Sequence, residues 1–375
     1  MFVNVDWFFY SHRLPIAIAA KNHNFDMSVY TDLTLEQKTN IDFQFNLNQS
    51  PFERKLRISP KIIIEFIKTF QLIKRKKPDL IHAVTIKPII ILGIISRITS
   101  TPFLAAFSGL GPSFKKEKFY QQITFNLVIL LLRFIFKNKS SSVICQTNHD
   151  KEELIKYGVI ASKKISLIRG SGVDINVFTP LKKNKDLGKF ILMSSRMLSD
   201  KGVIEYCSAA KIVKKEFKGD IKFLLSGPID LSSPTSISQI ELDRLTLEHG
   251  VEYIGNCIDM PELLASAEIF VYPSYYPEGI PKVLIEALSC SVPIITTDHP
   301  GCRDVVINKE TGILVPIKDP KRLAKSILSL LEDKKAQEEY GLKGRKLVSE
   351  IFEVSKVIKL HFNIYKKLSD LKISN

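Results

Sequence analysis

The sequence of 375 residues has a single tryptophan, few cysteines and no long uninterrupted apolar segment. Its five cysteines are odd in number and scattered without a Cys-x-x-Cys pair, which argues against a disulfide scaffold and a zinc site. The longest charge-free segments are 98–114, which contains two prolines and two glycines, and 119–132, which has only 14 residues. Because about 20 apolar residues are needed to cross a bilayer, no transmembrane helix is predicted. The opening residues also lack the basic start of a signal peptide, so a cytoplasmic location is expected.

Acidic residues are scarce relative to basic ones, and the imbalance lies in the first half of the chain. The sequence contains 54 Lys+Arg against 39 Asp+Glu, a net charge of +15. Residues 1–180 contain 25 basic and 13 acidic residues, whereas residues 181–375 contain 29 and 26. Three interpretations stay open: a solvated surface, a patch for an anionic membrane, or a nucleic-acid surface. No zinc-finger, RNP or basic-helix pattern supports the last, so nucleic acid is not an expected partner.

Short apolar segments alternate with helical segments along the whole chain, which is typical of parallel α/β architecture. The alternation restarts after residue 188, so the sequence predicts two doubly wound domains. The expected divisions are a first domain over 1–170, a Gly-, Pro-, Asn- and Lys-rich linker over 171–188, a second domain over 189–350 and a terminal helix over 351–375. The expected strands are Met1–Val5, Met27–Thr31, Leu80–Ala83, Pro102–Phe107, Val143–Gln146, Ile165–Ile168, Phe190–Ser194, Ile221–Leu225, Val251–Ile254, Ile269–Pro273, Pro293–Thr296 and Gly312–Val315.

The most informative segment is a loop that leads into a predicted helix over 282–289. Pro281 suits a helix start because its missing N–H costs nothing there, and Gly279 lets a ligand approach the backbone closely. The free N–H groups at such a helix start suit a diphosphate. Glu278 lies beside that position and Glu286 lies two helical turns on, where each carboxylate could accept hydrogen bonds from sugar hydroxyls.

The motif Glu278-(x7)-Glu286, within PEGIPKVLIEAL and followed by PIITTDHPGCRDVV and TGILVP, resembles the retaining glycosyltransferases of family 4. Three further segments resemble that family: the Arg196-(x4)-Lys201 loop, Gly172-Val173-Asp174 and residues 251–264. The resemblance implies the α/β GT-B fold, in which two doubly wound, Rossmann-like domains face a central cleft. It also implies that the terminal helix crosses back to the first domain.

The resemblance makes the second domain the nucleotide-sugar-binding one. Arg196 and Lys201 would neutralise the donor diphosphate as it leaves, and Glu278 would contact the transferred sugar; these three are the expected catalytic residues. Glu286 would contact the nucleotide ribose. The remaining expected donor-binding residues are Asn256, Cys257 and Ile258 around the base and Gly279, Ile280 and Pro281 near the diphosphate or sugar.

No two aspartates lie two positions apart, so the chain lacks the Asp-x-Asp element of metal-dependent glycosyltransferases of the other common fold. With the Arg–Lys loop present, neither a metal nor another cofactor is expected. No carboxylate nucleophile is evident either. The expected route is therefore front-face displacement, in which the leaving diphosphate itself takes the proton of the acceptor hydroxyl.

In the first domain, residues 3–15 (VNVDWFFYSHRLP), 81–88 and 106–111 resemble a subgroup of family 4 that extends bacterial glycans on undecaprenyl diphosphate. This implies a UDP-sugar donor, carrying an N-acetylhexosamine or a hexose, and a polyprenyl-diphosphate-linked saccharide as acceptor. Many relatives have a Gly-Gly loop after the first strand and a histidine where this chain has Ser108, so that histidine cannot be carried over. The expected acceptor-binding residues are His12, Arg13, His82, Lys87, Ser108, Gly109 and Gly111.

The resemblance thus predicts a glycosyltransferase of O-antigen, capsule or glycoprotein-glycan synthesis. We expect it to be peripheral on the inner face of the cytoplasmic membrane, held to the anionic surface by its basic first domain. Two alternatives stay open. A non-hydrolysing UDP-sugar 2-epimerase would use the same scaffold without a lipid-linked acceptor. A non-catalytic basic membrane- or nucleic-acid-binding module would have no use for Glu278 and Glu286.

Overall fold

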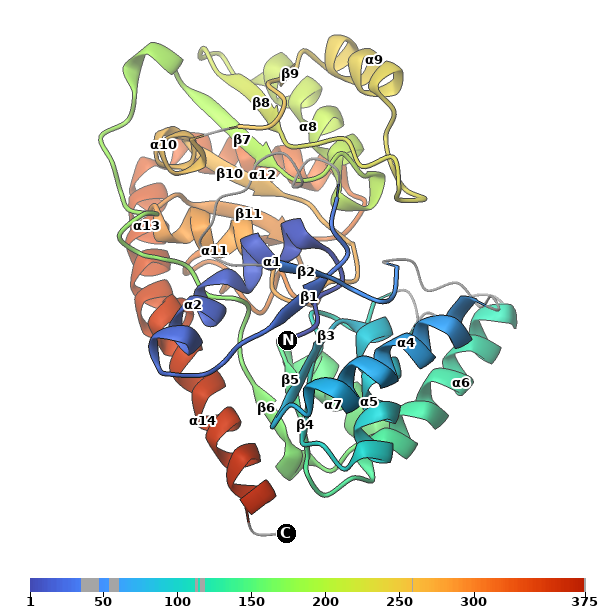
Figure 1. The fold of residues 1–375 in the computed structure, drawn as a ribbon. Coiled ribbons are helices and arrows are strands. Elements are labelled where there is room, and N and C mark those ends of the chain that lie inside the picture. The colour runs from blue at the N-terminus through green and yellow to red at the C-terminus, as the bar shows by residue number, and fades with distance from the viewer. Residues whose placement is uncertain (35–46, 54–60, 112–113, 115–118, 258, 374–375) are drawn as a thin grey trace. The chain divides into compact units, whose positions relative to one another are not determined.

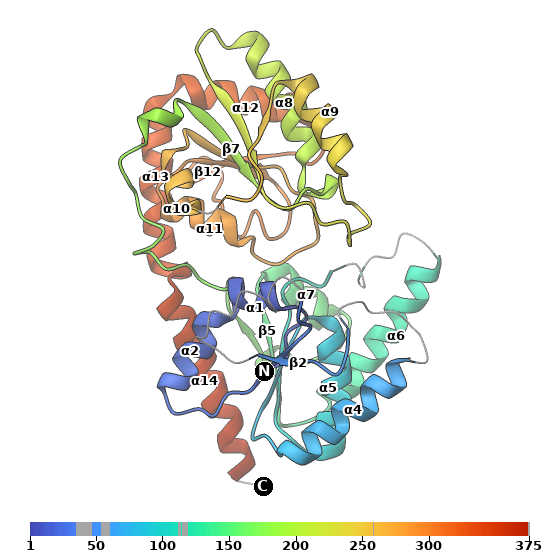
Figure 2. The same ribbon diagram turned by 45° about the horizontal axis from the view of Figure 1, so that its top comes forward.

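The computed structural model describes residues 1–375 except 35–46, 54–60, 112–113, 115–118, 258 and 374–375. The chain divides into two units, which are described separately (Figures 1 and 2). The first unit comprises Met1–Ser171 together with Ser355–Asn375, and the second comprises Gly172–Val354. The segment suggested as a linker lies almost wholly in the second unit, because buried Val173 donates its N–H to the carbonyl of Phe352.

The first unit is built on a parallel sheet whose four main strands are paired in chain order. A single residue of the opening segment, Phe2, bridges Tyr30 on one side and Ala83 on the other, and so joins a further strand pair to this sheet. The strands are nearly all buried on both faces, as their Val-, Ile- and Ala-rich sequences require. Their bounds are β1 Val29–Thr31, β2 Leu47–Gln49, β3 Ile81–Val84, β4 Phe103–Ala106, β5 Ser141–Cys145 and β6 Ile165–Leu167.

Helices cover both faces of this sheet because alternate strand residues point to opposite sides. Ala83 and Ala105 belong to one core, and the adjacent Val84 and Ala106 belong to the other. The first core is covered by α4 (Lys61–Lys76), α5 (Ile86–Thr99), α6 (Phe119–Phe136) and α7 (Asn148–Lys156). The second is covered by α1 (Asp6–His12), α2 (Leu14–Asn22) and the terminal helix α14 (Val354–Ile373).

The second unit contains a six-stranded parallel sheet in the order β12-β11-β10-β7-β8-β9. From β7 the chain winds outward through β8 and β9, and then returns to the other side of β7 through β10. The order of winding therefore reverses between β7 and β10, where open α/β sheets bind ligands at the carboxyl ends of their strands. The bounds are β7 Phe190–Ser194, β8 Lys222–Ser226, β9 Glu252–Tyr253, β10 Ile269–Tyr272, β11 Ile294–Thr297 and β12 Gly312–Val315.

Two helical layers enclose this second sheet. One core includes residues of α8 (Val203–Glu216), α9 (Gln239–His249) and α12 (Pro320–Glu332). The opposite core includes residues of α10 (Met260–Ser266) and α11 (Lys282–Ser289), and α13 (Lys334–Leu347) contacts both α11 and α12. Short turns complete the fold: η2 Ser162–Lys164, η3 Lys185–Leu187, η4 Ser199–Lys201 and the π-helical η5 Val348–Phe352.

None of the helices in the described parts of the chain is both long enough and apolar enough to cross a bilayer.

Candidate functional site

The loop after β7 brings a buried lysine to the point where the winding of the second sheet reverses. η4 ends at Lys201, of which 4% is exposed, and Gly202 follows in the left-handed conformation with φ 84°. A Cβ atom on Gly202 would lie 2.3 Å from the carbonyl oxygen of Pro273. The turn into α8 therefore requires glycine and is pressed against the loop that follows β10.

Lys201 meets a carboxylate and a phenol from the neighbouring strand and loop. Its Nζ forms an ion pair with Glu278 and donates to the Tyr272 hydroxyl at 2.8 Å. That hydroxyl in turn donates to Oε1 of Glu278 at 2.9 Å. Burial raises the pKa of Tyr272 well above its usual value, and the negative charge of Glu278 raises it further. The phenol therefore keeps the proton that it donates. The three groups form a closed triangle.

Arg196 provides a second cation on the same loop. Its Nη1 lies 2.7 Å from Oδ2 of Asp230, and its guanidinium lies 5.8 Å from the ring centroid of Tyr276. Lys201 Nζ lies 4.6 Å from the same ring, so Tyr276 is close to both cations. Burial lowers the pKa of Arg196, but Asp230 and Tyr276 together outweigh it, so its pKa is raised and the cation is favoured.

The loop that carries Glu278 is held in place from beneath. Thr296 donates its hydroxyl to the carbonyl of Tyr272 at 2.6 Å, and Thr297 donates to the carbonyl of Ser274. A Cβ on Gly301 would lie 2.2 Å from the carbonyl oxygen of Gly279, so a second glycine allows two loop backbones to touch. These contacts fix the loop that precedes α11.

Helix α11 has the bounds that the sequence predicts, Lys282–Ser289, with Pro281 as its N-cap and Ile280 buried before it. Glu286 is nearly buried on this helix and pairs with Lys282, with 2.8 Å between Oε1 and Nζ. Lys282 is one turn before Glu286 on the same helix. The structure therefore gives Glu286 a local partner, and the ribose contact stays a prediction.

The residues predicted to surround a base lie after β9. Asn256 is exposed, Cys257 is half-buried, and Ile258 lies outside the described residues. Burial raises the pKa of the Cys257 thiol. The preceding Gly255 is tied to the carboxyl end of β8 because its carbonyl accepts from the Ser226 hydroxyl at 3.0 Å. This places the segment at the same edge of the sheet as the Arg196–Lys201 loop.

In the first unit, the predicted residues near the start of the chain lie at the junction of α1 and α2. Arg13 is fully buried, and its Nη2 donates to the Ser108 hydroxyl at 3.3 Å. Burial lowers the pKa of Arg13 to about 10. His12 stacks on Phe8 with 4.2 Å between ring centroids. Two predicted acceptor-binding residues, Arg13 and Ser108, are therefore in contact, but the Arg13 side chain is buried within the first unit.

His82 has a structural environment. It lies in β3, is buried, and its Nδ1 is 2.8 Å from the hydroxyl of Tyr365 on α14, where His361 lies nearby. Burial lowers the pKa of His82 well below its usual value and lowers that of His361 to about 3. Both rings are therefore neutral, and they pack the terminal helix against the sheet of the first unit.

Lys87, another predicted acceptor-binding residue, is also buried. Its Nζ lies 3.0 Å from Oε2 of Glu65 and donates to the carbonyl of Glu53 at 2.7 Å, so it joins α5 to α4. Gly109 and Gly111 are half-buried and both have positive φ, 96° and 65°, as a turn after β4 requires.

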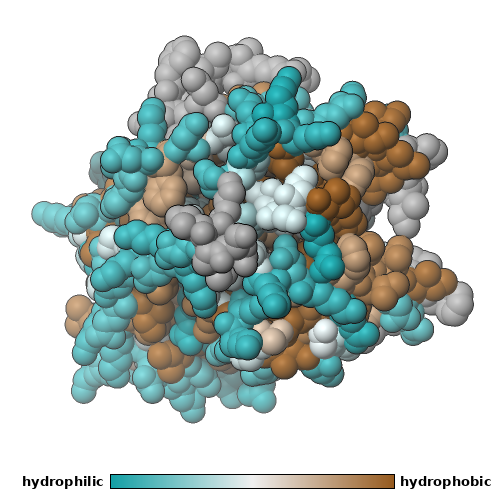
Figure 3. Space-filling view, turned by 60° about the horizontal axis from the view of Figure 1, so that its bottom comes forward, coloured by the Kyte–Doolittle hydropathy of each residue, from teal (hydrophilic) through white to brown (hydrophobic). Residues whose placement is uncertain are grey.

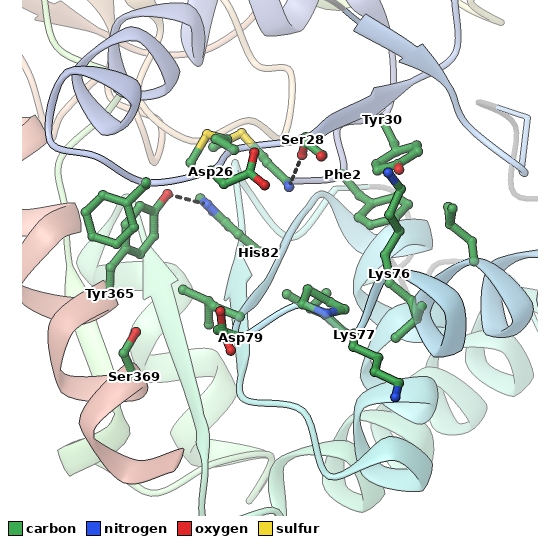
Figure 4. Close-up of a pocket in the computed structure, with 18 of the residues that line it drawn as sticks. Phe2, Asp26, Ser28, Tyr30, Lys76, Lys77, Asp79, His82, Tyr365 and Ser369 are labelled. Carbon is green, nitrogen blue, oxygen red and sulfur yellow. Dashed lines mark hydrogen bonds between the residues drawn. The ribbon is translucent and has the colours of Figure 1, made fainter. Parts of the chain in front are cut away.

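A cavity of about 610 Å³ lies elsewhere in the first unit (Figure 4). Its walls include the segments that precede β1 and β3, the end of α4 and part of α14. Charges of both signs line it, from Asp26, Asp79, Lys76 and Lys77. Because parallel sheets bind ligands at the carboxyl ends of their strands, this cavity at the amino ends is not assigned to the reaction.

Three residues of the site were missed from sequence: Tyr272, Tyr276 and Asp230. Tyr272 falls within the expected strand Ile269–Pro273, and its place near the carboxyl end of that strand is the signal that points to the candidate site. Asp230 is 34 residues from Arg196, and nothing in its local sequence indicates the pairing. Among the described residues, no group of three or more His, Cys, Asp or Glu side chains has metal-site geometry.

Two family models match the chain, one for each unit. A model described as glycosyl transferases group 1 matches residues 178–347, and one described as glycosyl transferase 4-like matches residues 1–147. Both models describe glycosyltransferases, which supports an enzyme over the non-catalytic module.

Individual relatives match across most of the chain. One, from Campylobacter jejuni, is N,N'-diacetylbacillosaminyl-diphospho-undecaprenol alpha-1,3-N-acetylgalactosaminyltransferase, 26% identical over 87% of each chain. Another, from Escherichia coli, is UDP-Gal:alpha-D-GlcNAc-diphosphoundecaprenol alpha-1,3-galactosyltransferase, 27% identical over 72% of this chain and 70% of the relative. The fold is similar to that of HepE from Anabaena, solved with UDP and glucose, with a TM-score of 0.76, 19% identity and 94% of each chain covered.

Proposed function

This chain is a glycosyltransferase of the group 1 family with the two-domain GT-B fold, and we propose that it transfers a sugar from a UDP-sugar to a saccharide linked to polyprenyl diphosphate. The sugar would be an N-acetylhexosamine or a hexose. The observation that carries the proposal is the pair of cations on the loop after β7, each beside the aromatic ring of Tyr276. Two fixed cations at the carboxyl edge of a doubly wound sheet suit a diphosphate.

The donor would bind in the second unit. Its diphosphate would compete with Asp230 for Arg196 and with Glu278 for Lys201, because each of these carboxylates is within hydrogen-bond range of its cation. Arg196 offers a planar fork of donors, and Lys201 a compact charge. Once Lys201 binds the diphosphate, the Glu278 carboxylate could accept hydrogen bonds from hydroxyl groups of the sugar. The base would lie along 256–258, and Glu286 would reach the ribose if its bond to Lys282 opens.

The acceptor proposal rests on the relatives. The Campylobacter jejuni and Escherichia coli enzymes are named for acceptors linked to undecaprenyl diphosphate, and both names specify alpha linkages. The UDP-sugars of common hexoses carry an α bond to the diphosphate, so an α product would mean retention at the anomeric carbon. Of the predicted acceptor residues, His12 and the glycines near residue 110 are accessible enough to touch a substrate, whereas Arg13, His82 and Lys87 are buried and would act only through their neighbours.

The proposed chemistry is a front-face displacement. The bond between the anomeric carbon and the diphosphate oxygen breaks, and the acceptor oxygen bonds to that carbon on the same face. The acceptor proton passes to the departing diphosphate, so no further base is required. Arg196 and Lys201 would stabilise the charge on the diphosphate, and positioned charge of this kind is commonly worth a factor of about 10² to 10³ per donor. Because the diphosphate is neutralised by side chains, we propose that no metal is needed.

We further propose that the protein works at the inner face of the cytoplasmic membrane in the synthesis of a bacterial surface glycan. A polyprenyl-linked acceptor remains in the bilayer, so the enzyme must approach the lipid surface. The excess of basic residues in the first half of the chain supports attraction to anionic lipid.

The test is UDP release from UDP-GalNAc, UDP-GlcNAc, UDP-galactose and UDP-glucose, with GlcNAc-diphosphoundecaprenol as acceptor and EDTA present. Acceptor-dependent release from one donor is expected, with loss of about 100-fold or more in Lys201→Ala and Glu278→Ala. The matched control is Lys211→Ala. Lys211 lies on α8, the helix that follows the site loop, and forms an exposed ion pair with Glu248. The activity of this variant should be unchanged.

Each other outcome points elsewhere. Loss of activity in EDTA that added Mg²⁺ restores would contradict the metal-free mechanism. Conversion of a UDP-sugar to its 2-epimer without acceptor would favour the epimerase. A β-linked product, identified by its anomeric proton coupling in NMR, would contradict retention.

A further inference from the structure

The helical layer of the first unit that faces away from its sheet has an unusual outer surface. Helix α6 is apolar on two sides, because its inner residues fill the core while Ile123, Leu127, Leu130 and Phe134 point outward. These four are 56%, 45%, 63% and 47% exposed, and their spacing of four, three and four places them in one stripe along the helix. Packing within the first unit explains only the inner side of α6.

The neighbouring helix extends the same surface. On α4, Ile63, Ile64 and Ile67 are exposed. Both α4 and α6 pack on α5, and both ribbon views show them on the same side of the sheet (Figures 1 and 2). Figure 3 shows hydrophobic atoms gathered toward the side of the molecule where these helices lie, with hydrophilic atoms beside them. In the described part of the second unit, exposed large hydrophobic residues are spread over several elements, with at most two on one helix, Ile240 and Leu247 of α9.

The charges on α4, α5 and α6 are nearly all positive. The sequences of α4, α5 and α6 contain one acidic residue, Glu65, and that residue is paired with buried Lys87. Basic residues accompany the apolar side chains on both helices: Arg97 lies over Phe134 of α6, with 4.5 Å between its guanidinium carbon and the ring centroid. The exposed basic residues of α4 are Lys61, Lys68, Lys74, Arg75 and Lys76.

We propose that the outward faces of α6 and α4 form a membrane-docking surface that inserts its apolar side chains into the headgroup region of an anionic bilayer. Interfacial helices have this combination of a narrow apolar face and flanking Lys and Arg. A protein partner of ordinary composition would present both signs of charge, whereas an anionic lipid surface presents only the complement of this one. The proposal deepens the membrane location given under the proposed function, but it needs neither donor nor acceptor.

The test is flotation of the full chain with vesicles of phosphatidylcholine containing 30% phosphatidylglycerol, without substrates. Leu127→Gln/Leu130→Gln should raise the lipid concentration for half-binding at least tenfold. The matched control is Ile240→Gln/Leu247→Gln on α9 of the second unit, whose side chains are 84% and 87% exposed. It should change binding less than twofold. Pure phosphatidylcholine, or 0.5 M NaCl, should weaken binding of the unchanged chain.

A second measurement reports insertion directly. Leu130→Cys labelled with an environment-sensitive fluorophore should shift to the blue on anionic vesicles, whereas labelled Leu247→Cys should not. Equal vesicle binding by both glutamine pairs, absence of binding by the unchanged chain, or a dimer in solution that Leu127→Gln/Leu130→Gln abolishes would each overturn the proposal. Circular dichroism checks that both pairs fold. Transfer to a short, water-soluble acceptor analogue should persist in the α6 variant, which separates a failure of docking from a failure of the proposed reaction.

Discussion

Both units consist of a parallel sheet between helices, but the charged residues of their motifs have different surroundings. In the second unit, Arg196, Lys201 and Glu278 come from two loops and meet at one edge of the sheet. In the first unit, His82 and Lys87 are buried and bound to other helices of the same unit. Motif residues of the second unit therefore cluster where we propose the donor site, while several motif residues of the first hold the fold together.

The largest expected effect tests how tightly the loops of the second unit are joined. Gly202→Ala would place a methyl group 2.3 Å from the carbonyl oxygen of Pro273, so the two loops must separate. We expect a loss of about 4 kcal/mol in unfolding free energy, with nearly complete loss of activity. Chemical unfolding of Gly202→Ala and of a control variant, followed by circular dichroism, measures the stability, and UDP release measures the activity.

Gly250→Ala on α9 is the matched control. Gly250 has a similar left-handed conformation, φ 66°, but its added Cβ would meet only the flexible end of Lys214. It should cost about 1 kcal/mol and leave the site intact. Equal effects of the two substitutions would show that strain, and not loop contact, makes Gly202 necessary.

The second prediction compares two buried lysines. Lys87→Met would leave the Glu65 carboxylate of α4 without its cationic partner and should destabilise the first unit by about 3 kcal/mol. Lys201→Met should abolish transfer but cost less stability, because Glu278 is more exposed and keeps the Tyr272 hydroxyl. Hydrogen exchange would locate the first loss in the first unit. Adding Glu65→Leu to Lys87→Met should restore most of the stability; no recovery would argue against the ion pair as the cause.

Much of this arrangement follows from sequence, but the pairings do not. Apolar runs indicate most of the buried strands, and Phe190–Ser194 and Gly312–Val315 have the expected bounds. The expected strand Met1–Val5 is wrong, because only Phe2 of that segment forms a bridge. Strand β2, Leu47–Gln49, was missed because an edge strand of sequence LNQ has no apolar run. The burial of Lys87 was also missed, because its partner Glu65 is 22 residues away and only the packing of α4 on α5 brings them together. Motifs show which residues cluster, whereas burial depends on neighbours that are distant in sequence.

The third prediction uses the neutral histidines that join α14 to the first unit. Their pKa values in the folded chain are below the usual 6.5, so the unfolded chain binds protons first as the pH falls. Stability should therefore decrease between pH 7.5 and 5.5, by about 1.4 kcal/mol for each histidine. His361→Leu should remove one such contribution, seen as a flatter dependence of unfolding free energy on pH. Exposed His149→Gln should leave the slope unchanged; an equal slope in His361→Leu would contradict the assignment.

The smallest expected effect concerns the Tyr272 hydroxyl, which closes the triangle between Lys201 and Glu278. Tyr272→Phe keeps the ion pair but removes one hydrogen bond to each partner, so kcat/KM should fall about fivefold, the equivalent of about 1 kcal/mol. The control is Tyr206→Phe, since that buried hydroxyl also makes two hydrogen bonds in the second unit, but to the carbonyls of Ile191 and Leu224. Tyr206→Phe should lower stability by a similar amount without changing kcat/KM. If both variants lose activity equally, the Tyr272 hydroxyl acts through the general stability of the second unit. Tyr272 would then have a structural role like that of His82 and Lys87 in the first unit, and the difference between the two units would not hold at this residue.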